Sequence, residues 1–445
     1  MTDFFIKKLR ELVPDTINEK VLWQAKKCLV DYLACTIAGS KILSEKTLTY
    51  IDALNSQCDD VVVLGLSRKA SLQTAALVNG MNSHVMELDD GQRRGAVHVG
   101  GTIFSALLPV AEKEHLTMRD VLLGAIVGYE VTIRLACAVQ PGNKLRGYHA
   151  TGTCEIVGAA MGIAAALHFD FDQMKSAFSA AVTSAAGVLE MQEDNADYKP
   201  LNVGRAAMDA VSAAYLGKSR FNPPKDALGG RRGFLAVMTD SPKKEFLTEF
   251  AKGEFYIQSI YNKLYSSCRH THSAIEAALS IRQQKGFNVD DVESICVRTY
   301  KLAVGGHDHT IIDGINSAKM SMPYSVAVAL VTGRAGISEF SEEMLSNKKV
   351  LELASKVHVV VDEELTALCP QCRAAIVEVK TPMDSFTARI DYPKGEPENP
   401  LTKEEFQQKF EGLMLFAGYE KKTCDMLTEI VYRTEFHVDE IMSLL

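Results

Sequence analysis

The residues best suited to proton-transfer chemistry stand in one glycine-punctuated stretch, HVMELDDGQRRGAVHVG, at positions 84–100. Asp89 and Asp90 are adjacent carboxylates, and Arg93 adds a guanidinium. His98 supplies an imidazole, the side chain that titrates nearest to neutral pH. Crowding these groups between glycines predicts a structured loop of a working site.

Four further segments place cations, histidines or a tyrosine where a loop ends and an apolar helix is expected to begin. The segments are RGYHATGT (146–153), NADYKPLNVGRAA (195–207), KLYSSCRHTHSAIEAAL (263–279) and AKMSMPYSVAVAL (318–330), and they supply His149, Lys199, Lys263, Arg269, His272, Lys319 and Tyr324. Taken alone, each residue is more often a capping or surface group than a functional one. Their recurrence predicts a pocket for a polyanionic small molecule, because carboxylates in a low-dielectric cleft need matching donors and positive charge.

Composition limits the classes of partner. The chain has 445 residues, 47% of them hydrophobic, and a net charge of -8, which argues against nucleic acid or an anionic membrane as the main partner. The start, MTDFFIKKLRELV, resembles an amphipathic helix and not a signal peptide. Ten scattered cysteines fit a reducing compartment, so a cytoplasmic location is expected.

The hydrophobic pattern predicts a mainly α fold with a smaller α+β lid. The apolar segment 121–139 carries Glu130 and Arg134 at i, i+4 spacing, which favours a buried core helix over a membrane span. Alanine- and glycine-rich segments at 153–168, 174–190 and 204–217 predict closely packed helices. Strand patterns at 292–304, 357–362, 373–381 and 385–393 alternate with helical segments at 273–285 and 317–331. The predicted domains are 1–265, all-helical and completed by 401–445, and 266–400, the α+β lid.

Three other kinds of site receive less support. Cys369-Pro-Gln-Cys372 is a single CxxC without a second pair, so neither a metal nor a redox site is expected. His307-Asp308-His309 and His270-Thr271-His272 match no metal-ligand spacing and are interpreted as solvated loops. An iron–sulfur cluster would need three or more clustered cysteines. A non-catalytic carboxylate-binding protein stays open, since it would share the cations.

Six motifs in order along nearly the whole chain carry a resemblance to the MmgE/PrpD family. They are ALVNGMNSHVMELDDG with a following His-Val-Gly, GYHATGT (147–153), YKPLNVGRAA (198–207), GGRRGFL (229–235), Lys-x4-Cys-Arg-x-Thr-His from position 263, and SMPY (321–324). The resemblance implies a homodimeric enzyme with a large all-helical domain, a smaller α/β lid, and the site between them. It also implies catalysis without metal or organic cofactor, as in 2-methylcitrate dehydratase, cis-aconitate decarboxylase and iminodisuccinate epimerase.

The resemblance assigns roles to individual residues. His98 matches the family's proton-moving histidine, His149 the second pocket histidine, and Lys199, Lys263 and Tyr324 match the remaining motif positions. The chain departs from the decarboxylases at Glu87, at Gly91 and at Cys268, where they have a lid histidine and where the nearby His272 is a possible substitute. Lys-Pro-Leu-Asn at 199–202 is similar to the epimerase branch.

The chemistry that these residues share is proton transfer beside a carboxylate, which passes through an enolate-like species. We expect His98 to carry the proton, with Tyr324 or His149 as the opposite-face acid. Lys199, Lys263, Arg269 and also Arg93 are expected to bind carboxylates, whereas Asp89 and Asp90 would repel the substrate and are expected to orient the site. The sequence predicts a cofactor-independent lyase that dehydrates or decarboxylates a di- or tricarboxylate such as 2-methylcitrate, citrate or cis-aconitate. The alternative is an epimerase of an iminodisuccinate-like dicarboxylate.

Overall fold

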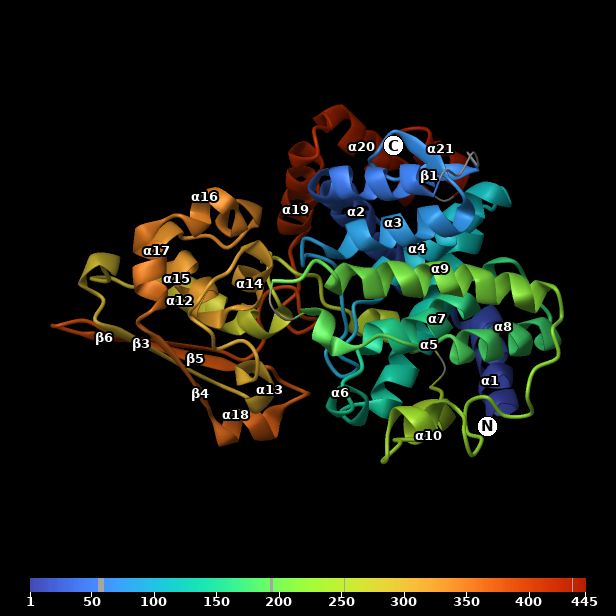
Figure 1. Ribbon diagram of the computed structural model, residues 1–445, viewed down its shortest axis with the longest axis horizontal. Coiled ribbons are helices and arrows are strands. Elements are labelled where there is room, and N and C mark those ends of the chain that lie inside the picture. Colours follow the sequence, from blue (N-terminus) through green and yellow to red (C-terminus); the bar gives the residue numbers. More distant parts are fainter. Residues whose placement is uncertain (55–59, 193–194, 252, 434) are drawn as a thin grey trace.

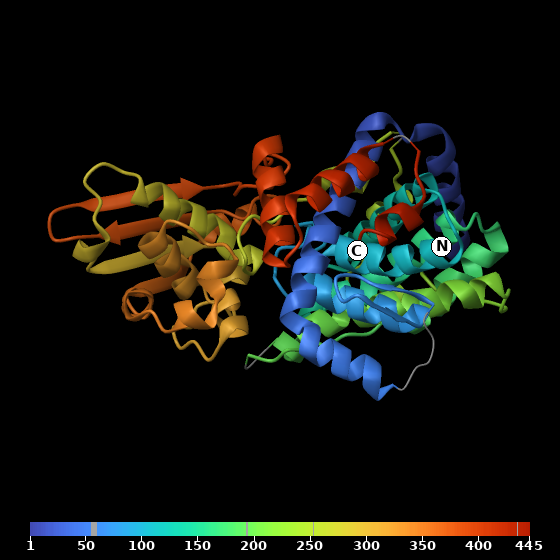
Figure 2. The same ribbon diagram turned by 90° about the horizontal axis from the view of Figure 1, so that it is seen from above.

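The computed structural model describes residues 1–54, 60–192, 195–251, 253–433 and 435–445. Two lobes of unequal size lie side by side (Figures 1 and 2). The larger, here called the body, has a hydrophobic core that runs from Phe5 to Ile260 and from Leu401 to Met442. The smaller, here called the lid, has a separate core from Tyr265 to Phe386. The fold is mainly α with an α+β lobe, which confirms the predicted class.

The body is built from helices of both ends of the chain. They are α1 (Thr2–Thr16), α2 (Glu19–Ala53), α3 (Leu72–His84), α4 (Val99–Lys113), α5 (Met118–Val139), α6 (Gly142–Leu145), α7 (Ala150–Ala166), α8 (Phe171–Thr183), α9 (Lys199–Lys218), α10 (Phe234–Met238), α11 (Glu245–Thr248), α19 (Lys403–Phe416), α20 (Lys421–Tyr432) and α21 (Val438–Met442). A hairpin of β1 (Val61–Val63) and β2 (Arg68–Ala70) interrupts them. This hairpin departs from the predicted all-helical domain, because strands of three residues carry too little alternation to be recognised in a sequence.

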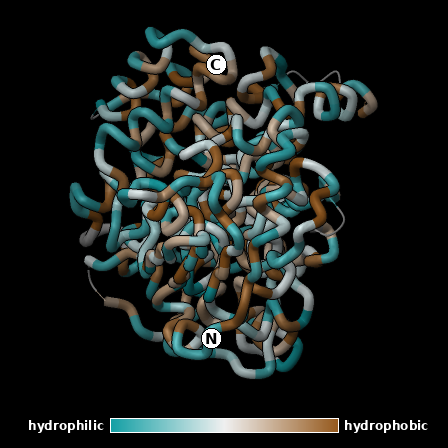
Figure 3. Tube along the Cα trace, turned by 90° about the vertical axis from the view of Figure 1, so that its left-hand side faces the viewer, coloured by the Kyte–Doolittle hydropathy of each residue, from teal (hydrophilic) through white to brown (hydrophobic). Residues whose placement is uncertain are grey.

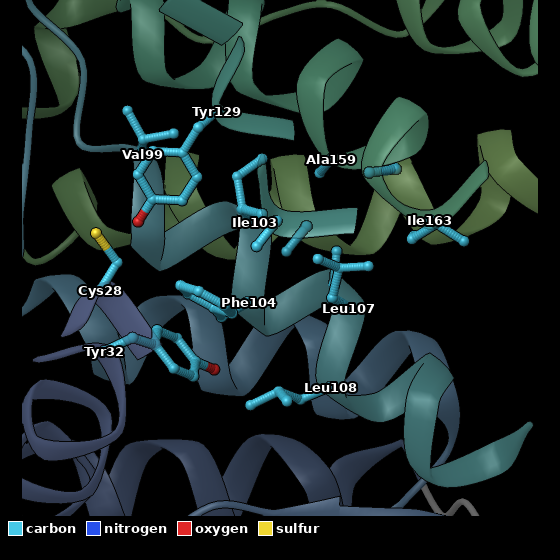
Figure 4. Packing of buried hydrophobic residues seen from close by; sticks show 14 of the residues in the cluster. Cys28, Tyr32, Val99, Ile103, Phe104, Leu107, Leu108, Tyr129, Ala159 and Ile163 are labelled. Atoms are coloured by element: carbon cyan, nitrogen blue, oxygen red, sulfur yellow. The ribbon is translucent and has the colours of Figure 1, made fainter. Parts of the chain in front are cut away.

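The central helices of the body are almost wholly buried. In α5, 94% of the most apolar 18-residue window is buried, so this helix belongs to the core as predicted. Glu130 and Arg134 form an ion pair of 2.7 Å inside it. On α4, Phe104 packs between Tyr32 and Tyr129 at ring-centroid distances of 5.4 and 6.2 Å (Figure 4). This packing fixes the axis of α4 and therefore where the helix begins.

Small residues let the helices approach closely. A Cβ atom on Gly80 of α3 would lie 2.5 Å from the Cα atom of Gly204 on α9. A Cβ atom on Gly124 of α5 would lie 2.7 Å from the carbonyl oxygen of Gly162 on α7. Side chains would separate both pairs, so the alanine- and glycine-rich sequence holds these helices in register.

The lid is a four-stranded sheet covered by helices. Its strands are β3 (Ser294–Thr299), β4 (Val357–Val361), β5 (Ala375–Lys380) and β6 (Ser385–Ile390). The order is β4-β3-β5-β6, with β4 parallel to β3 and the other pairs antiparallel. The helices are α12 (His272–Arg282), α13 (Lys301–Val304), α14 (Ile315–Met320), α15 (Met322–Thr332), α16 (Glu342–Leu345), α17 (Lys348–Ala354) and α18 (Glu363–Leu368). The helix predicted at 317–331 is two helices, because Ser321 caps α15 and Pro323 stands in its first turn.

The chain crosses between the lobes twice, and the two crossings run side by side. The amide of Asn262 donates to the carbonyl of Gly395 at 3.0 Å. Gly395 has φ +91°, and a Cβ atom there would lie 1.7 Å from the carbonyl oxygen of Asn262, so glycine is required. Tyr261 also pairs with Gly91 in an antiparallel bridge. Seen from the lid end, hydrophilic and hydrophobic residues alternate along the chain, as amphipathic elements require (Figure 3).

Candidate functional site

Three packed helices of the body begin at the same pocket. His98 is the residue before α4, His149 is the residue before α7, and Lys199 is the first residue of α9. The helices contact one another pairwise, and α9 starts at the end of the body that faces the lid (Figure 1). Helix packing alone therefore brings together residues that lie up to 101 positions apart in the sequence.

A cavity that is partly open to solvent lies where the lobes meet. The body contributes Ala96, His98, Gln140, Lys144, Tyr148, His149, Ala150, Leu189 and Lys199, and the first crossing and the lid contribute Tyr261, Cys268, Arg269, His270, His307 and Arg373. Of the predicted site residues, His98, His149, Lys199 and Arg269 line this cavity. Residues from both lobes thus share one pocket.

A buried ionic network lies behind the pocket wall. Glu87 pairs with Lys199 through Oε1 and with Lys263 through Oε2, the second contact at 2.8 Å. Oδ1 of Asp89 lies 3.7 Å from Nζ of Lys263. Oδ2 of Asp89 forms a hydrogen bond of 2.7 Å with Nδ1 of His84. Burial raises the pKa of Glu87, but the two lysines outweigh it, and the pKa lies well below its usual value. Lys263, predicted to bind substrate, is fully buried in this network and supports the pocket from behind.

Two residues of the stretch 84–100 have a left-handed backbone conformation. Glu87 has φ +54°, and the pocket residue Ala96 has φ +52°. Non-glycine residues in this left-handed region cost about 1 kcal/mol or more, and such strain is concentrated at functional sites. The loop at 84–98 is held in this conformation by the network and by the bridge to the first crossing.

His98 lies next to two carboxyl groups of the body. Its backbone N–H donates to Glu155 at 2.9 Å, and its Nδ1 lies 3.6 Å from Oδ2 of Asp89. Burial, with Lys263 as the next cause, lowers its pKa well below the usual value. Nδ1 has no hydrogen-bond partner among the described residues, and an uncharged imidazole can accept a proton.

A hydrogen bond from Asn202 fixes the ring of His149. Its Nδ1 lies 3.3 Å from the side-chain amide nitrogen of Asn202, which makes Nδ1 the acceptor and leaves the proton on Nε2. Burial and the charge of Lys199 lower its pKa well below the usual value.

The positive charge of the pocket is only partly compensated. Lys199 pairs with Glu87, and Arg269 pairs with Glu396 at 2.8 Å. Lys144 and Arg373 have no carboxylate within ion-pair distance among the described residues. None of the lining residues is acidic.

Arg373 is a buried cation whose guanidinium is only partly hydrogen-bonded. It is only 8% exposed, and its Nε atom has no hydrogen-bond partner in the described chain. One terminal nitrogen donates to the carbonyl of Arg93 at 2.5 Å. A buried guanidinium without an anion is costly, and a ligand carboxylate in the cavity would relieve that cost.

Four predicted site residues lie elsewhere. The hydroxyl of Tyr324 donates to the carbonyl of Glu339 at 2.9 Å inside the lid core, so Tyr324 does not face the pocket as expected. Arg93 pairs with Glu396 at 2.8 Å and with Glu398 on the second crossing. His272 is fully buried behind Arg269, whose guanidinium lies 2.9 Å from its Nδ1. These three are therefore positioned to support structure and not to touch a substrate in the cavity.

Asp90 is the fourth. Its carboxyl accepts from the hydroxyl of Tyr129 at 2.5 Å and from the amide of Gly100 at 2.8 Å, in the first turn of α4. Burial, together with the charge of Asp31, raises its pKa to about 7. Its position agrees with the supporting role predicted for it, because it holds the start of the helix that presents His98.

The interpretation of the two His-x-His segments as solvated loops is wrong. His270 and His307 line the pocket, and His307 lies 3.6 Å from the sulfur atom of Cys268. One ligand-type atom of each of these three residues lies within 4.8 Å of the others. The same holds for His84, Asp89 and His98. Lys144, Arg373 and Lys199 lie near Cys268, His270 and His307, so a divalent cation would meet repulsion there.

Three pocket residues, Lys144, Arg373 and His307, were not among the predicted site residues. Lys144 stands two residues before the RGYHATGT motif, so the motif itself was the available signal. Arg373 lies just before β5, and its nearness to the body follows only from how the lid docks. In the CxxC segment, Cys372 donates its thiol to the carbonyl of Asp391, and the nine cysteines that the structure describes are free.

Comparison with known proteins agrees with this architecture. The family model for the MmgE/PrpD N-terminal domain matches residues 5–247, and that for the MmgE/PrpD C-terminal domain matches residues 265–431. The chain is 27% identical to a cis-aconitate decarboxylase-like protein of Aspergillus oryzae, over 91% of this chain and 88% of the relative. It is 24% identical to human cis-aconitate decarboxylase, over 92% and 87%, and 23% identical to 2-methylcitrate dehydratase of Salmonella typhimurium, over 58% and 54%. The chain belongs to the MmgE/PrpD family.

Proposed function

We propose that the protein is a lyase that dehydrates or decarboxylates a small di- or tricarboxylic acid through proton transfer beside a carboxylate. The observation that carries this proposal is the only partly compensated positive charge of a pocket whose lining contains four cations, four histidines and no carboxylate. A substrate with two or three carboxylates supplies the missing anions. The relatives, named as cis-aconitate decarboxylases and 2-methylcitrate dehydratases, support the same class of substrate.

Each pocket group has a task in this chemistry. Arg373 and Lys144 bind substrate carboxylates, and Lys199 and Arg269 hold the charge that develops on the enolate. His98 acts at the reacting carbon, where its imidazole accepts a proton. His149 offers its Nε2–H as a hydrogen bond to the oxygen where charge develops. Because all these groups are side chains, we propose that the enzyme works without metal or organic cofactor.

The second candidate is epimerisation of an iminodisuccinate-like dicarboxylate. It is favoured by Lys-Pro-Leu-Asn at 199–202 and by Asn202, whose amide holds His149. Such an enzyme would remove a proton and return it without breaking a second bond. We further propose a homodimer located in the cytoplasm, as the family resemblance and the composition suggest.

The test is turnover in deuterated water followed by NMR. The protein is incubated with citrate, 2-methylcitrate, cis-aconitate and iminodisuccinate, and both product formation and deuterium uptake are recorded. Water or carbon dioxide loss from one of the tricarboxylates is the expected result, reduced at least about 100-fold in His98→Gln, the loss typical of a removed acid or base. Exchange or racemisation alone would favour the epimerase, and no reaction with any acid would overturn the proposal.

A further inference from the structure

The lid side of the pocket carries a thiol beside two imidazoles. Cys268 and His307 both line the cavity, with Sγ of Cys268 3.6 Å from Nε2 of His307. The ring of His270 lies 5.2 Å from that of His307, measured between centroids. Nδ1 of His270 lies 2.6 Å from the hydroxyl of Tyr300. These groups face His98 and His149, which come from the body, across one cavity.

The backbone holds the thiol in place. The amide of Cys268 donates to the carbonyl of Lys319 at 2.9 Å, and its own carbonyl accepts from the amide of Thr271 at 2.9 Å. His307 is only 6% exposed, and its amide and carbonyl are both bonded, the carbonyl to Met322 at 2.8 Å. The pair is therefore a fixed part of the lid.

The charged groups around the thiol favour its ionised form. Burial alone would raise the pKa of Cys268, but His307, by charge and hydrogen bond, and then Lys199 outweigh it and lower the pKa to about 6. Glu87 acts in the opposite direction. Lys144 faces the thiol from the body, and His270 and Tyr300 face it from the lid.

We propose that Cys268 is the lid-side base of the reaction, acting as a thiolate held by its hydrogen bond with His307. This inference rests on the proposed function and assigns one of its steps. The C–H bond beside a substrate carboxylate breaks, an S–H bond forms, and the electron pair stays on the substrate as an enolate. Lys199 and Arg269 hold the enolate charge, while Arg373 and Lys144 hold the substrate carboxylates. The return of a proton to that carbon, from the thiol or from an imidazole across the pocket, completes the exchange. Two proton-moving groups on opposite walls serve either face of the carbon.

The first test measures the thiolate directly. Alkylation of the intact protein by iodoacetamide is followed by mass spectrometry at Cys268 as a function of pH. The rate is expected to rise with a midpoint near pH 6, and His307→Gln is expected to slow it about tenfold at neutral pH, because the thiolate loses its partner. A saturated tricarboxylate, propane-1,2,3-tricarboxylate, should protect the thiol. A wild-type midpoint at the ordinary thiol value of about 8.5 would overturn the pair.

The second test separates the base from the site around it. Cys268→Ala and Cys268→Ser are expected to lose deuterium exchange and turnover at least about 100-fold, with the affinity for propane-1,2,3-tricarboxylate changed less than about threefold. Cys296→Ala, on β3 and away from the pocket, is the matched control and should leave both quantities unchanged. If the wild type turns over an acid and Cys268→Ala retains that activity, the inference fails while the proposed function stands. If the wild type turns over no acid, the proposed function fails, and the base role of Cys268 fails with it. The pH midpoint of alkylation then still tests whether Cys268 is a thiolate paired with His307.

Discussion

Replacing Glu87 by glutamine tests the ionic network behind the pocket. Glu87 is 4% exposed and bridges Lys199 and Lys263, of which Lys263 is fully buried. Removing one partner of a buried ion pair costs about 3–5 kcal/mol, because the other charge stays buried. Asp89 still lies 3.7 Å from Lys263, so we expect the lower end of that range, about 3 kcal/mol.

Urea unfolding followed by circular dichroism gives the measurement. With a denaturant slope of about 3 kcal/mol per molar, Glu87→Gln should lower the midpoint of the body by about 1 M. Glu398→Gln is the matched control, since this glutamate also pairs with a cation but has a side chain 37% exposed, and it should cost less than about 1 kcal/mol. Equal midpoints for the two variants would refute the account of the network.

The pH dependence of the same comparison has a defined sign. The pKa of Glu87 is held below its ordinary value, so its contribution is fully present above the ordinary carboxyl pKa of about 4.3 and is lost as the pH falls through the lowered value. The stability difference between wild type and Glu87→Gln should therefore shrink in acid. A difference that is independent of pH would show that Glu87 is not ionised in the folded protein.

Three further variants test single features of the fold and site. Tyr324→Phe should keep kcat within about twofold and lose about 1 kcal/mol of stability, because the hydroxyl binds a backbone carbonyl in the lid core. A loss of kcat of about 100-fold would contradict this and indicate that Tyr324 acts in the pocket. Gly395→Ala should lower the melting temperature, because the φ of Gly395 is positive and a Cβ atom would meet the carbonyl of Asn262. The control Gly412→Ala, on the open side of α19, should not lower it. Equal melting temperatures for the two variants would contradict this. Asp90→Asn should gain stability relative to wild type as the pH rises from about 5 to about 8. The reason is that burial raises the pKa of Asp90 to about 7, so that ionisation of this carboxyl disfavours the folded state. A stability difference that stays constant with pH would refute the raised pKa.

The sequence predicted those parts of the site that local pattern determines. His98, His149 and Lys199 each stand where a polar loop meets an apolar helix, and because those helices pack together, the three residues meet. The strands of the lid followed from their alternation, which the sheet register bears out. Local signals of this kind survive folding because each helix or strand buries the face that its own sequence makes apolar.

The residues that were misplaced or not selected depend on how distant segments dock. Tyr324 opens an apolar helix like the true pocket residues, but that helix lies in the lid core, so its hydroxyl is directed at Glu339. Arg93 stands in the charged stretch 84–100, whereas Arg373 stands in unremarkable sequence. Only the docking of the crossing chain decides that Arg93 pairs with Glu396 and that Arg373 faces the cavity. Tertiary contacts of this sort leave no periodic trace in a single sequence.

The central claim is that the substrate's carboxylates supply the anions that the pocket lacks. Calorimetric titration with propane-1,2,3-tricarboxylate tests it most directly, with wild type compared with Lys144→Met, Arg373→Met and the double variant. Each lost charged hydrogen bond is worth about 1.5–3 kcal/mol, so each single variant should bind about 10- to 150-fold more weakly and the double variant more weakly still. Affinity for the tricarboxylate that is unchanged in the double variant would contradict the account.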